Sequence, residues 1–112
     1  MIKESEDKIQ SDCFVWFHNT YPHLRGLLCY NLNNSRNKID GARNKAMGLI
    51  AGRADMVLYF KGTALMIEMK TPENNQDPAQ KVWEAKIKEQ GFQYVICRSL
   101  SEFQSLIFAF LK

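Results

Sequence analysis

The sequence has few of the residues that build disulfide frameworks or zinc sites. Its three cysteines are an odd number, and none belongs to a C-x-x-C pair, which argues against a disulfide scaffold or a cysteine zinc site. Cys13, Cys29 and Cys97 each lie among apolar neighbours, and this predicts buried free thiols in a reducing compartment. The two histidines, His18 and His23, have no partner at metal-ligand spacing.

Long apolar runs are also missing. No segment is apolar for long enough to span a bilayer, and the N-terminal stretch MIKESEDKIQ is charged and lacks the apolar run of a secretory signal. We therefore expect a cytoplasmic or nucleoid location and no membrane partner. With 112 residues, 46% of them hydrophobic and 24% charged, the chain suits one globular domain with one core. We expect that domain to span residues 1–112.

A strong excess of one charge is absent as well, because the formal net charge is only +3. The distribution is more informative than the total. Between residues 36 and 53 there is a single acid, Asp40, against five basic residues: Arg36, Lys38, Arg43, Lys45 and Arg53. Such a cluster is expected of a surface that faces nucleic-acid phosphates. A solvated helix face has the same composition, and charge alone does not separate the two interpretations.

Apolar periodicity and turn signals predict an α/β fold in the order helix, strand, helix, strand, strand, helix, strand, helix. The first helix is expected at residues 6–19 and a basic second helix at residues 39–47. A third helix runs from a capping box at Asp77 to Gly91, and a fourth begins after Ser99. The short apolar runs predict strands at residues 27–30, 55–60, 63–70 and 94–97.

The most informative segment is the pair of strands joined at residues 61–62. Lysine followed by glycine predicts a two-residue hairpin turn, and counting outward from that turn places Asp55 directly opposite Glu68. Opposed side chains on one face have Cβ atoms roughly 4.5 to 5.5 Å apart, and like charges there are destabilising. Lys70 is two residues beyond Glu68 and points to the same face. The remaining residues are mostly apolar on both faces, which predicts a sheet covered on both sides.

An acid pair and a lysine at the end of an apolar sheet have two explanations. Lys70 could hold the end together as a salt bridge, or a divalent cation could lie between Asp55 and Glu68. Because Lys70 neutralises only one of the carboxylates, we favour the cation site. Oxygen ligands favour Mg²⁺ or Mn²⁺ over zinc. Such a cation brings Lewis acidity and a bound water of lowered pKa, and Lys70 would orient the water or offset phosphate charge. The combination predicts phosphodiester hydrolysis.

These residues resemble a known signature. Gly52 and Asp55, followed by Glu68-Met69-Lys70, are similar to the G-x-x-D and E-x-K motifs of the PD-(D/E)XK nucleases. More narrowly, the chain resembles their virus-type replication-repair branch, the VRR-NUC domain, over nearly its whole length. The further matches are Glu6, Ile9 and Gln10 in the first helix and Gln80, Trp83 and Gly91 in the third. One departure is Ala54, where many family members have proline, a residue that supplies no ligand.

The resemblance implies a restriction-endonuclease-like core, a mixed sheet flanked by helices, and a metal-dependent nuclease site. By resemblance, Asp55 and Glu68 bind the metal with help from the backbone carbonyl of Met69. Lys70 serves the nucleophilic water.

Two more site residues come from the resemblance, each with a structural alternative. Glu6 resembles the additional acid that reaches the metal from the first helix, but an acid also suits a helix start. Gln80 would bind near the scissile phosphate or the water, but it is also the capping-box residue of the third helix. Different populations of the Gln80 side chain would fill the two roles. Trp16 and Trp83 have the spacing of core residues, which we favour over base-stacking platforms.

The resemblance implies an endonuclease acting on branched or flapped DNA. Without a separate reading domain, shape and phosphate contacts are expected to dominate recognition. Stand-alone members resemble Holliday-junction resolvases, which act as two-fold dimers, and the apolar tail at residues 106–111 is a candidate homodimer interface. The alternative function is a nucleic-acid-binding or scaffold module that has this fold and does not cut. A third possibility is a restriction-like or single-strand nuclease.

Overall fold

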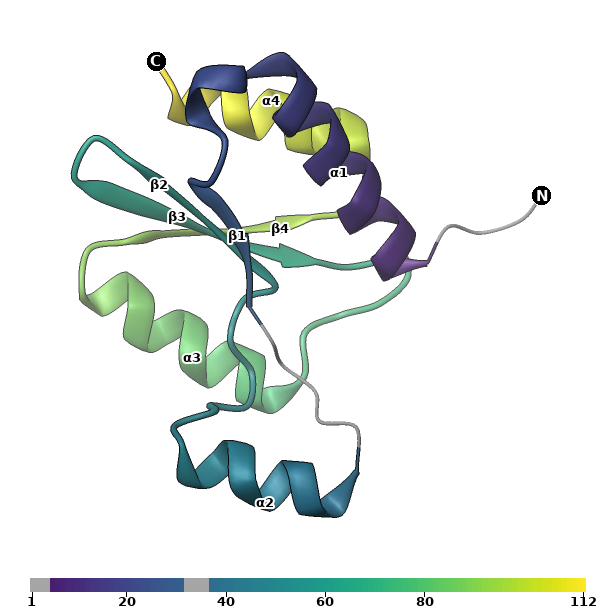
Figure 1. The fold of residues 1–112 in the computed structure, drawn as a ribbon, viewed down its shortest axis with the longest axis vertical. Coiled ribbons are helices and arrows are strands. Elements are labelled where there is room, and N and C mark those ends of the chain that lie inside the picture. The colour runs from purple at the N-terminus through teal and green to yellow at the C-terminus, as the bar shows by residue number, and fades with distance from the viewer. Residues whose placement is uncertain (1–4, 32–36) are drawn as a thin grey trace.

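The computed structural model describes residues 5–31 and 37–112, and its helices and strands follow the predicted order. One short 3-10 helix is added, at Pro22–Leu24. In Figure 1, helices α1 and α4 lie on one face of the central sheet, α3 lies on the other face, and α2 lies beyond α3. The elements are α1 (Glu6–Thr20), β1 (Leu28–Tyr30), α2 (Lys38–Ala46), β2 (Met56–Phe60), β3 (Thr63–Met69), α3 (Pro78–Glu89), β4 (Gln93–Cys97) and α4 (Leu100–Phe110).

The four strands form one mixed sheet in the order β1-β2-β3-β4. β1, β2 and β3 pair antiparallel, whereas β3 and β4 pair parallel. Phe60 pairs with Thr63 across the hairpin, as the sequence predicted. Lys61 and Gly62 have φ of 49° and 79°, the left-handed values that a two-residue type I′ turn requires at both positions. The predicted turn and register are therefore confirmed.

The hydrophobic core lies between the sheet and the α1–α4 layer. Met56, Leu58, Leu65 and Ile67 line that face of the hairpin, and all four are buried. The helices cover them with a second set of buried side chains: Ile9, Cys13, Phe17, Phe103 and Ile107. Burying this alternating set is the main stabilising contribution to such a layered fold.

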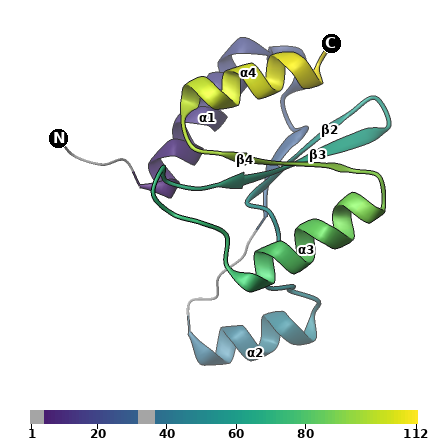
Figure 2. The ribbon, with the colours of Figure 1, turned by 180° about the vertical axis from the view of Figure 1, so that it is seen from behind.

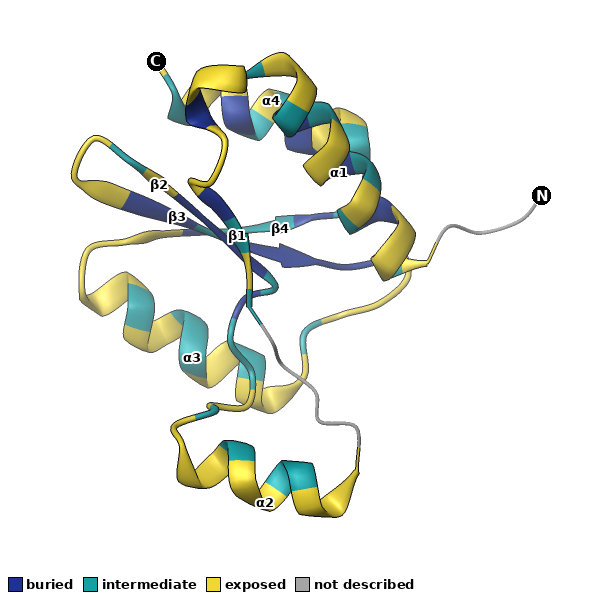
Figure 3. Ribbon diagram, viewed as in Figure 1, coloured by how far each residue is buried: buried dark blue, intermediate teal, exposed yellow. Residues whose placement is uncertain are grey.

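The opposite face of the sheet is covered less completely than the sequence predicted. Helix α3 packs over part of it, and Val57 and Ala64 are buried there, but α3 itself has no buried residue. Tyr59, on the same face, is 51% exposed. In Figure 3, α1 and α4 contain dark-blue buried residues, whereas α3 is yellow and teal along its length. The single helix α3 covers less of its face of the sheet than α1 and α4 together cover of the other face.

The apolar C-terminal tail contributes mainly to the chain's own core. Ile107 is buried, and Leu106, Phe110 and Leu111 pack against the core cluster. Phe108 is the member that stays 54% exposed. Less of this segment is therefore open to a partner than its composition predicted. No helix in the described part of the chain has the length and apolar character needed to cross a membrane.

The loop before β2 is held against α3 by a glycine. Gly52 has φ of 85°, and a Cβ at this position would lie 2.5 Å from the carbonyl carbon of Ala79 and 2.8 Å from the Gln80 nitrogen. Real Cβ atoms do not approach backbone this closely, so only glycine allows the contact. This close approach brings the segment that leads to Asp55 against the first turn of α3.

We expect Gly52→Ala to destabilise the protein more than Gly91→Ala does. Both glycines have a similar positive φ, 85° and 92°, but a Cβ at Gly91 would meet no atom within 4 Å. The control, Gly91→Ala, therefore measures only the stability lost by placing alanine in left-handed backbone, about 1 to 2 kcal/mol. Gly52→Ala adds the stability lost by overpacking against α3, about 1 to 3 kcal/mol. Urea unfolding of both variants checks this. Equal urea midpoints for the two variants would show that α3 moves away from residue 52 without a loss of stability.

Candidate functional site

Two acids meet where the β2–β3 hairpin ends. The last pair of the ladder is Met56 with Ile67, so Asp55 and Glu68 are the next residues outward and face each other. The Asp55 carboxylate (Oδ2) accepts a hydrogen bond of 2.7 Å from the backbone amide of Met69. The main-chain carbonyl of Asp55 accepts another, of 2.8 Å, from the backbone amide of Asn31. Asp55 is thus held at the position that the predicted register assigned to it.

Glu68 is a carboxylate with almost no contact with solvent. It is 1% exposed, and each of its oxygens accepts one hydrogen bond of 3.1 Å: Oε1 from the Tyr94 hydroxyl and Oε2 from the Gln80 amide nitrogen. Burial, the hydrogen bond with Asp55 and the negative charge of Asp55 together raise the pKa of Glu68 to about 8. Two carboxyl groups in this position cannot both ionise easily, so without a cation Glu68 keeps a proton near neutral pH.

Lys70 lies beside the acid pair and is 7% exposed. Its positive charge lowers the pKa of Glu68, but by less than burial and Asp55 raise it. Within residues 5–31 and 37–112 no ion pair joins Lys70 to Glu68. A salt bridge from Lys70 to Glu68 therefore does not account for this end of the sheet.

Gln80 combines the predicted capping box with a hydrogen bond to Glu68 in one conformation. Its side-chain oxygen accepts from the Asp77 amide at 2.9 Å, and Asp77 in turn accepts from the Gln80 amide, which completes the capping box. Its side-chain nitrogen donates to Glu68. The oxygen and the nitrogen of one amide thus serve the cap and Glu68 at the same time, and a role for Gln80 at the scissile phosphate or the water stays a prediction.

Glu6 lies at the start of α1, close to the loop that follows β3. Its Oε2 is 3.4 Å from the side-chain nitrogen of Asn74. Arg98 fixes the same loop by donating to the carbonyls of Thr71 at 2.7 Å and Asn74 at 2.6 Å. Across the described ranges, no three His, Cys, Asp or Glu side chains form a group that could hold a metal. Asp55 and Glu68 are therefore a pair, and Glu6 is not grouped with them.

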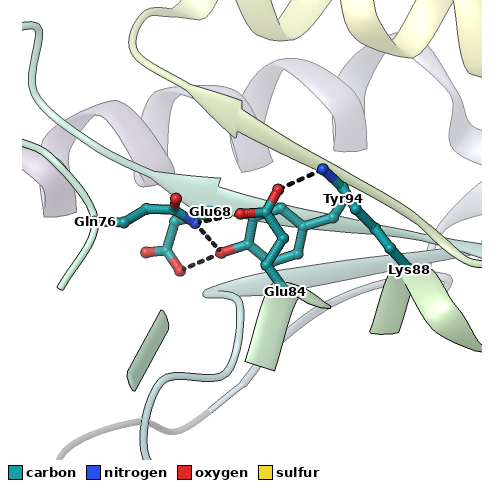
Figure 4. A network of polar contacts seen from close by, with 5 residues as sticks. All are labelled: Glu68, Gln76, Glu84, Lys88 and Tyr94. Atoms are coloured by element: carbon teal, nitrogen blue, oxygen red, sulfur yellow. Dashed lines mark hydrogen bonds and ion pairs between the residues drawn. The ribbon is translucent and has the colours of Figure 1, made fainter. Parts of the chain in front are cut away.

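The sequence analysis missed Tyr94, Gln76 and Glu84, which continue the polar contacts of Glu68 (Figure 4). Burial, and then the charge of Glu68, raise the pKa of Tyr94 above its usual range. Tyr94 pairs with Met66 through the parallel β3–β4 ladder, a register that no local pattern predicts. The available signal was a tyrosine in a short buried strand, since a buried tyrosine hydroxyl usually has a polar partner.

The basic residues divide between a helix and a loop. Lys38, Arg43 and Lys45 lie on α2 and are exposed, and Arg53 lies in the loop before β2. Arg36 falls outside the described residues. Figures 1 and 2 agree that α2 and α3 lie on the same side of the sheet, which is the side that Glu68 faces through its contact with Gln80. The basic helix and the acid pair thus share one side of the molecule.

No protein-family model matches the sequence, and no curated protein matches it either. Solved structures do match. One, described as "VRR_NUC domain protein", has a TM-score of 0.82 and 20% identity, over 97% of this chain and 89% of that chain. The chain has the VRR-NUC fold. A second structure, "VRR_NUC domain", aligns with a TM-score of 0.60 and 17% identity, over 87% of this chain and 91% of that chain. The fold predicted from the resemblance is confirmed.

The acid pair of this VRR-NUC fold is chemically suited to a hard divalent cation. Each Glu68 oxygen accepts one hydrogen bond and retains a second lone pair. The Met69 amide points toward Asp55, and in a strand the carbonyl of the same residue projects to the same side. Carboxylate and carbonyl oxygens are the ligands that Mg²⁺ and Mn²⁺ prefer. Burial, and then the hydrogen bond and the like charge of Asp55, raise the pKa of Glu68, and a cation would favour its charged form again.

The pKa of Glu68 predicts how stability depends on pH when chelator removes divalent cations. Its pKa is about 8 in the folded chain against 4.5 for an unperturbed glutamate, so the folded state binds more protons between these values. Stability is therefore fully present below about pH 4.5 and falls as pH rises toward 8, by at most about 1.4 kcal/mol per pH unit. Urea unfolding at several pH values measures the slope.

Glu68→Gln should flatten that pH dependence relative to the parent chain, because the amide does not titrate. Glu89→Gln, at an exposed position of α3, is the matched control and should leave the slope unchanged. Adding Mn²⁺ to the parent chain should raise its midpoint more at pH 8 than at pH 5, since the cation competes with the proton. Parallel pH curves for the parent and Glu68→Gln would contradict the pKa assignment.

Proposed function

We propose that this chain is a divalent-metal-dependent, structure-specific DNA endonuclease that hydrolyses phosphodiester bonds in branched DNA, such as Holliday junctions or flaps. The observation that supports it is the acid pair at the hairpin end, where the almost fully buried Glu68 is hydrogen-bonded to the half-buried Asp55 and Lys70 lies beside them. Carboxyl groups whose pKa is strongly shifted by burial and by a charged neighbour are concentrated at functional sites. The likeness to solved VRR_NUC domain structures adds support at the level of the fold.

Each site residue has a proposed role. Asp55 and Glu68, with the Met69 carbonyl, hold Mg²⁺ or Mn²⁺, which when bound supplies Lewis acidity and lowers the pKa of a coordinated water. Lys70, on the same face of β3, orients the nucleophilic water and offsets negative charge on the phosphate. Gln80 orients Glu68 through its side-chain nitrogen and lies where the scissile phosphate would approach.

Glu6 is proposed as an auxiliary acid. It lies at the loop after β3, where it would act on a metal-bound water or a second cation position. Because the described residues group no third acid with Asp55 and Glu68, the first cation position is held by that pair. The same observation favours the second candidate function, a VRR-NUC module that binds nucleic acid without cutting it, because two carboxylates alone hold a cation weakly.

The proposed DNA surface includes the basic residues of α2 and the loop that follows it. Lys38, Arg43 and Lys45 are exposed on the side of the sheet that Glu68 faces, and Arg53 lies two residues before Asp55. Contacts from these residues go to phosphates, so they provide affinity and orientation rather than base recognition. Arg36 belongs to the same proposed cluster by its place in the sequence.

We also propose that the active form is a homodimer. A four-way junction has two symmetric strands to cut, and a two-fold pair of identical sites matches that symmetry. The C-terminal tail contributes less to this interface than its sequence indicated, since Phe108 is the member that stays more than half exposed. Sedimentation equilibrium at micromolar concentration, with and without junction DNA, measures the oligomeric state. A monomer under both conditions would contradict the proposed homodimer.

The function is tested with fluorescent duplex, flap and four-way-junction DNAs in Mg²⁺, in Mn²⁺ or in chelator. We expect metal-dependent cutting of branched DNA that falls by at least about a hundredfold in Glu68→Gln and in Lys70→Met. Only Glu68→Gln should also lose Mn²⁺ binding. Glu89→Gln is the control and should cut normally.

Three results would count against this function in different ways. Cutting that survives Glu68→Gln would indicate a contaminant or another site. Binding of branched DNA without cutting in any metal would favour the non-cutting module. Preferential cutting of single strands would keep the site and change the substrate.

The DNA surface has its own prediction. Replacing Arg43 and Lys45 together with alanine should weaken binding of all DNAs similarly and reduce the slope of log affinity against log salt by roughly two, because each neutralised phosphate contributes about 0.9. Lys112→Ala removes a distant positive charge and should leave the slope unchanged. Fluorescence anisotropy over a salt series measures both, and an unchanged slope in the double variant would exclude α2 from the interface.

A further inference from the structure

A chain of hydrogen bonds runs from Glu68 to the outer side of α3 (Figure 4). The Tyr94 hydroxyl donates to Glu68 Oε1 at 3.1 Å. The Gln76 side-chain nitrogen lies 3.2 Å from the Tyr94 oxygen and 2.9 Å from Glu84 Oε1. The chain ends in an ion pair of 2.6 Å between Glu84 and Lys88. Four separate segments are joined: β3, the loop after it, α3 and β4.

The donors and acceptors in this chain can point in only one direction. Lys88 has donors alone, and the ionised Glu84 beside it has acceptors alone. Glu84 therefore requires the nitrogen of Gln76 and excludes its oxygen, which sets the orientation of that amide. The second hydrogen of the same nitrogen is then donated to the Tyr94 oxygen. A tyrosine hydroxyl has one hydrogen, and with its oxygen already accepting from Gln76, that hydrogen is available for Glu68.

Each oxygen of the Glu68 carboxylate is therefore held by one hydrogen-bond donor. Tyr94 reaches Oε1 from β4, and Gln80 reaches Oε2 from α3. Two donors from different elements restrict rotation of the carboxyl group, and a cation would take the place of the hydrogen bond that Glu68 makes with Asp55. Gln80 is already part of the proposed nuclease site. Tyr94, Gln76 and Glu84 have no role in it so far.

We propose that Tyr94 is a positioning residue for the cation ligand Glu68, with Gln76 and the Glu84–Lys88 ion pair setting the direction of its hydroxyl. The inference rests on the proposed function, because it assumes that Glu68 binds a divalent cation. Partners that orient a ligating carboxylate typically contribute 10-fold to 100-fold to metal affinity or activity. Tyr94 does not touch the cation or the DNA in this proposal. It lowers the free-energy cost of fixing the orientation of the Glu68 carboxylate when the cation binds.

The role of the hydroxyl can be separated from that of the ring. The Tyr94 ring packs beside Trp83, with 6.1 Å between ring centroids, and Tyr94→Phe keeps this contact while removing only the oxygen. Tyr59→Phe is the matched control, because Tyr59 lies on the same face of the sheet and is 51% exposed. Gln76→Met is the second variant. It removes both donors from a loop residue without changing the core, so the test survives if Tyr94→Phe folds poorly.

The experiment titrates Mn²⁺ into each full-length variant by calorimetry, in the absence of DNA, after thermal melts in chelator confirm folding. We expect Tyr94→Phe to bind Mn²⁺ 10-fold to 100-fold more weakly than the parent chain. Gln76→Met should weaken binding in the same direction by a smaller factor, and Tyr59→Phe should not change it. In cleavage assays, saturating Mn²⁺ should restore most of the kcat of Tyr94→Phe, with KM for DNA unchanged.

The outcomes distinguish the inference from the function beneath it. If the parent chain and Glu68→Gln both fail to bind Mn²⁺, the proposed function falls and this inference with it. If the parent chain binds Mn²⁺, Glu68→Gln does not, and Tyr94→Phe binds as the parent does, the inference alone is overturned. A loss of kcat in Tyr94→Phe that saturating Mn²⁺ does not restore would also overturn it, because positioning of a cation ligand is compensated by excess cation.

Discussion

The structure around the candidate site depends on the close approach of two carboxyl groups, the half-buried Asp55 and the almost fully buried Glu68. Burial disfavours the charged form of Glu68, and the hydrogen bond and the like charge of Asp55 add to this effect. The folded chain responds by keeping a proton on Glu68, whose pKa is raised to about 8. A divalent cation would satisfy the same constraint by another route. A bound proton and a bound cation would each reduce the unfavourable negative charge of the acid pair, so the two compete. The proposed activity requires the cation.

Local features of the chain place the two acids, and the surrounding elements then fix their geometry. The type I′ turn at residues 61–62 sets the hairpin register, which puts Asp55 and Glu68 opposite each other. Gly52 allows the preceding loop to touch the first turn of α3. That contact holds Gln80 where one amide can both cap the helix and reach Glu68. The capping box and the site therefore share a side chain.

The two faces of the sheet differ in burial and in polarity. The face under α1 and α4 is a continuous core, whereas the α3 face combines buried aliphatic residues with Glu68, Lys70 and an exposed Tyr59. The light cover lies near the hairpin turn, where Tyr59 is exposed, and it reduces the apolar area that this face buries. The basic helix α2 lies on this same side. The arrangement separates the part of the molecule that stabilises the fold from the part proposed to meet DNA.

The sequence by itself determined the order of the elements, the helix caps, the hairpin turn and the pairing of Asp55 with Glu68. All of these follow from residues close together in the chain, where turn chemistry and strand alternation are strict rules. Only the tertiary structure decided that Tyr94 and Gln76 reach Glu68, that Arg98 holds the loop near Glu6, that Tyr59 is exposed and that Ile107 belongs to the core. These depend on the parallel β3–β4 register and on which layer covers each face of the sheet. Such contacts join distant segments, and no local pattern specifies them because many registers and packings satisfy the same alternation of apolar residues.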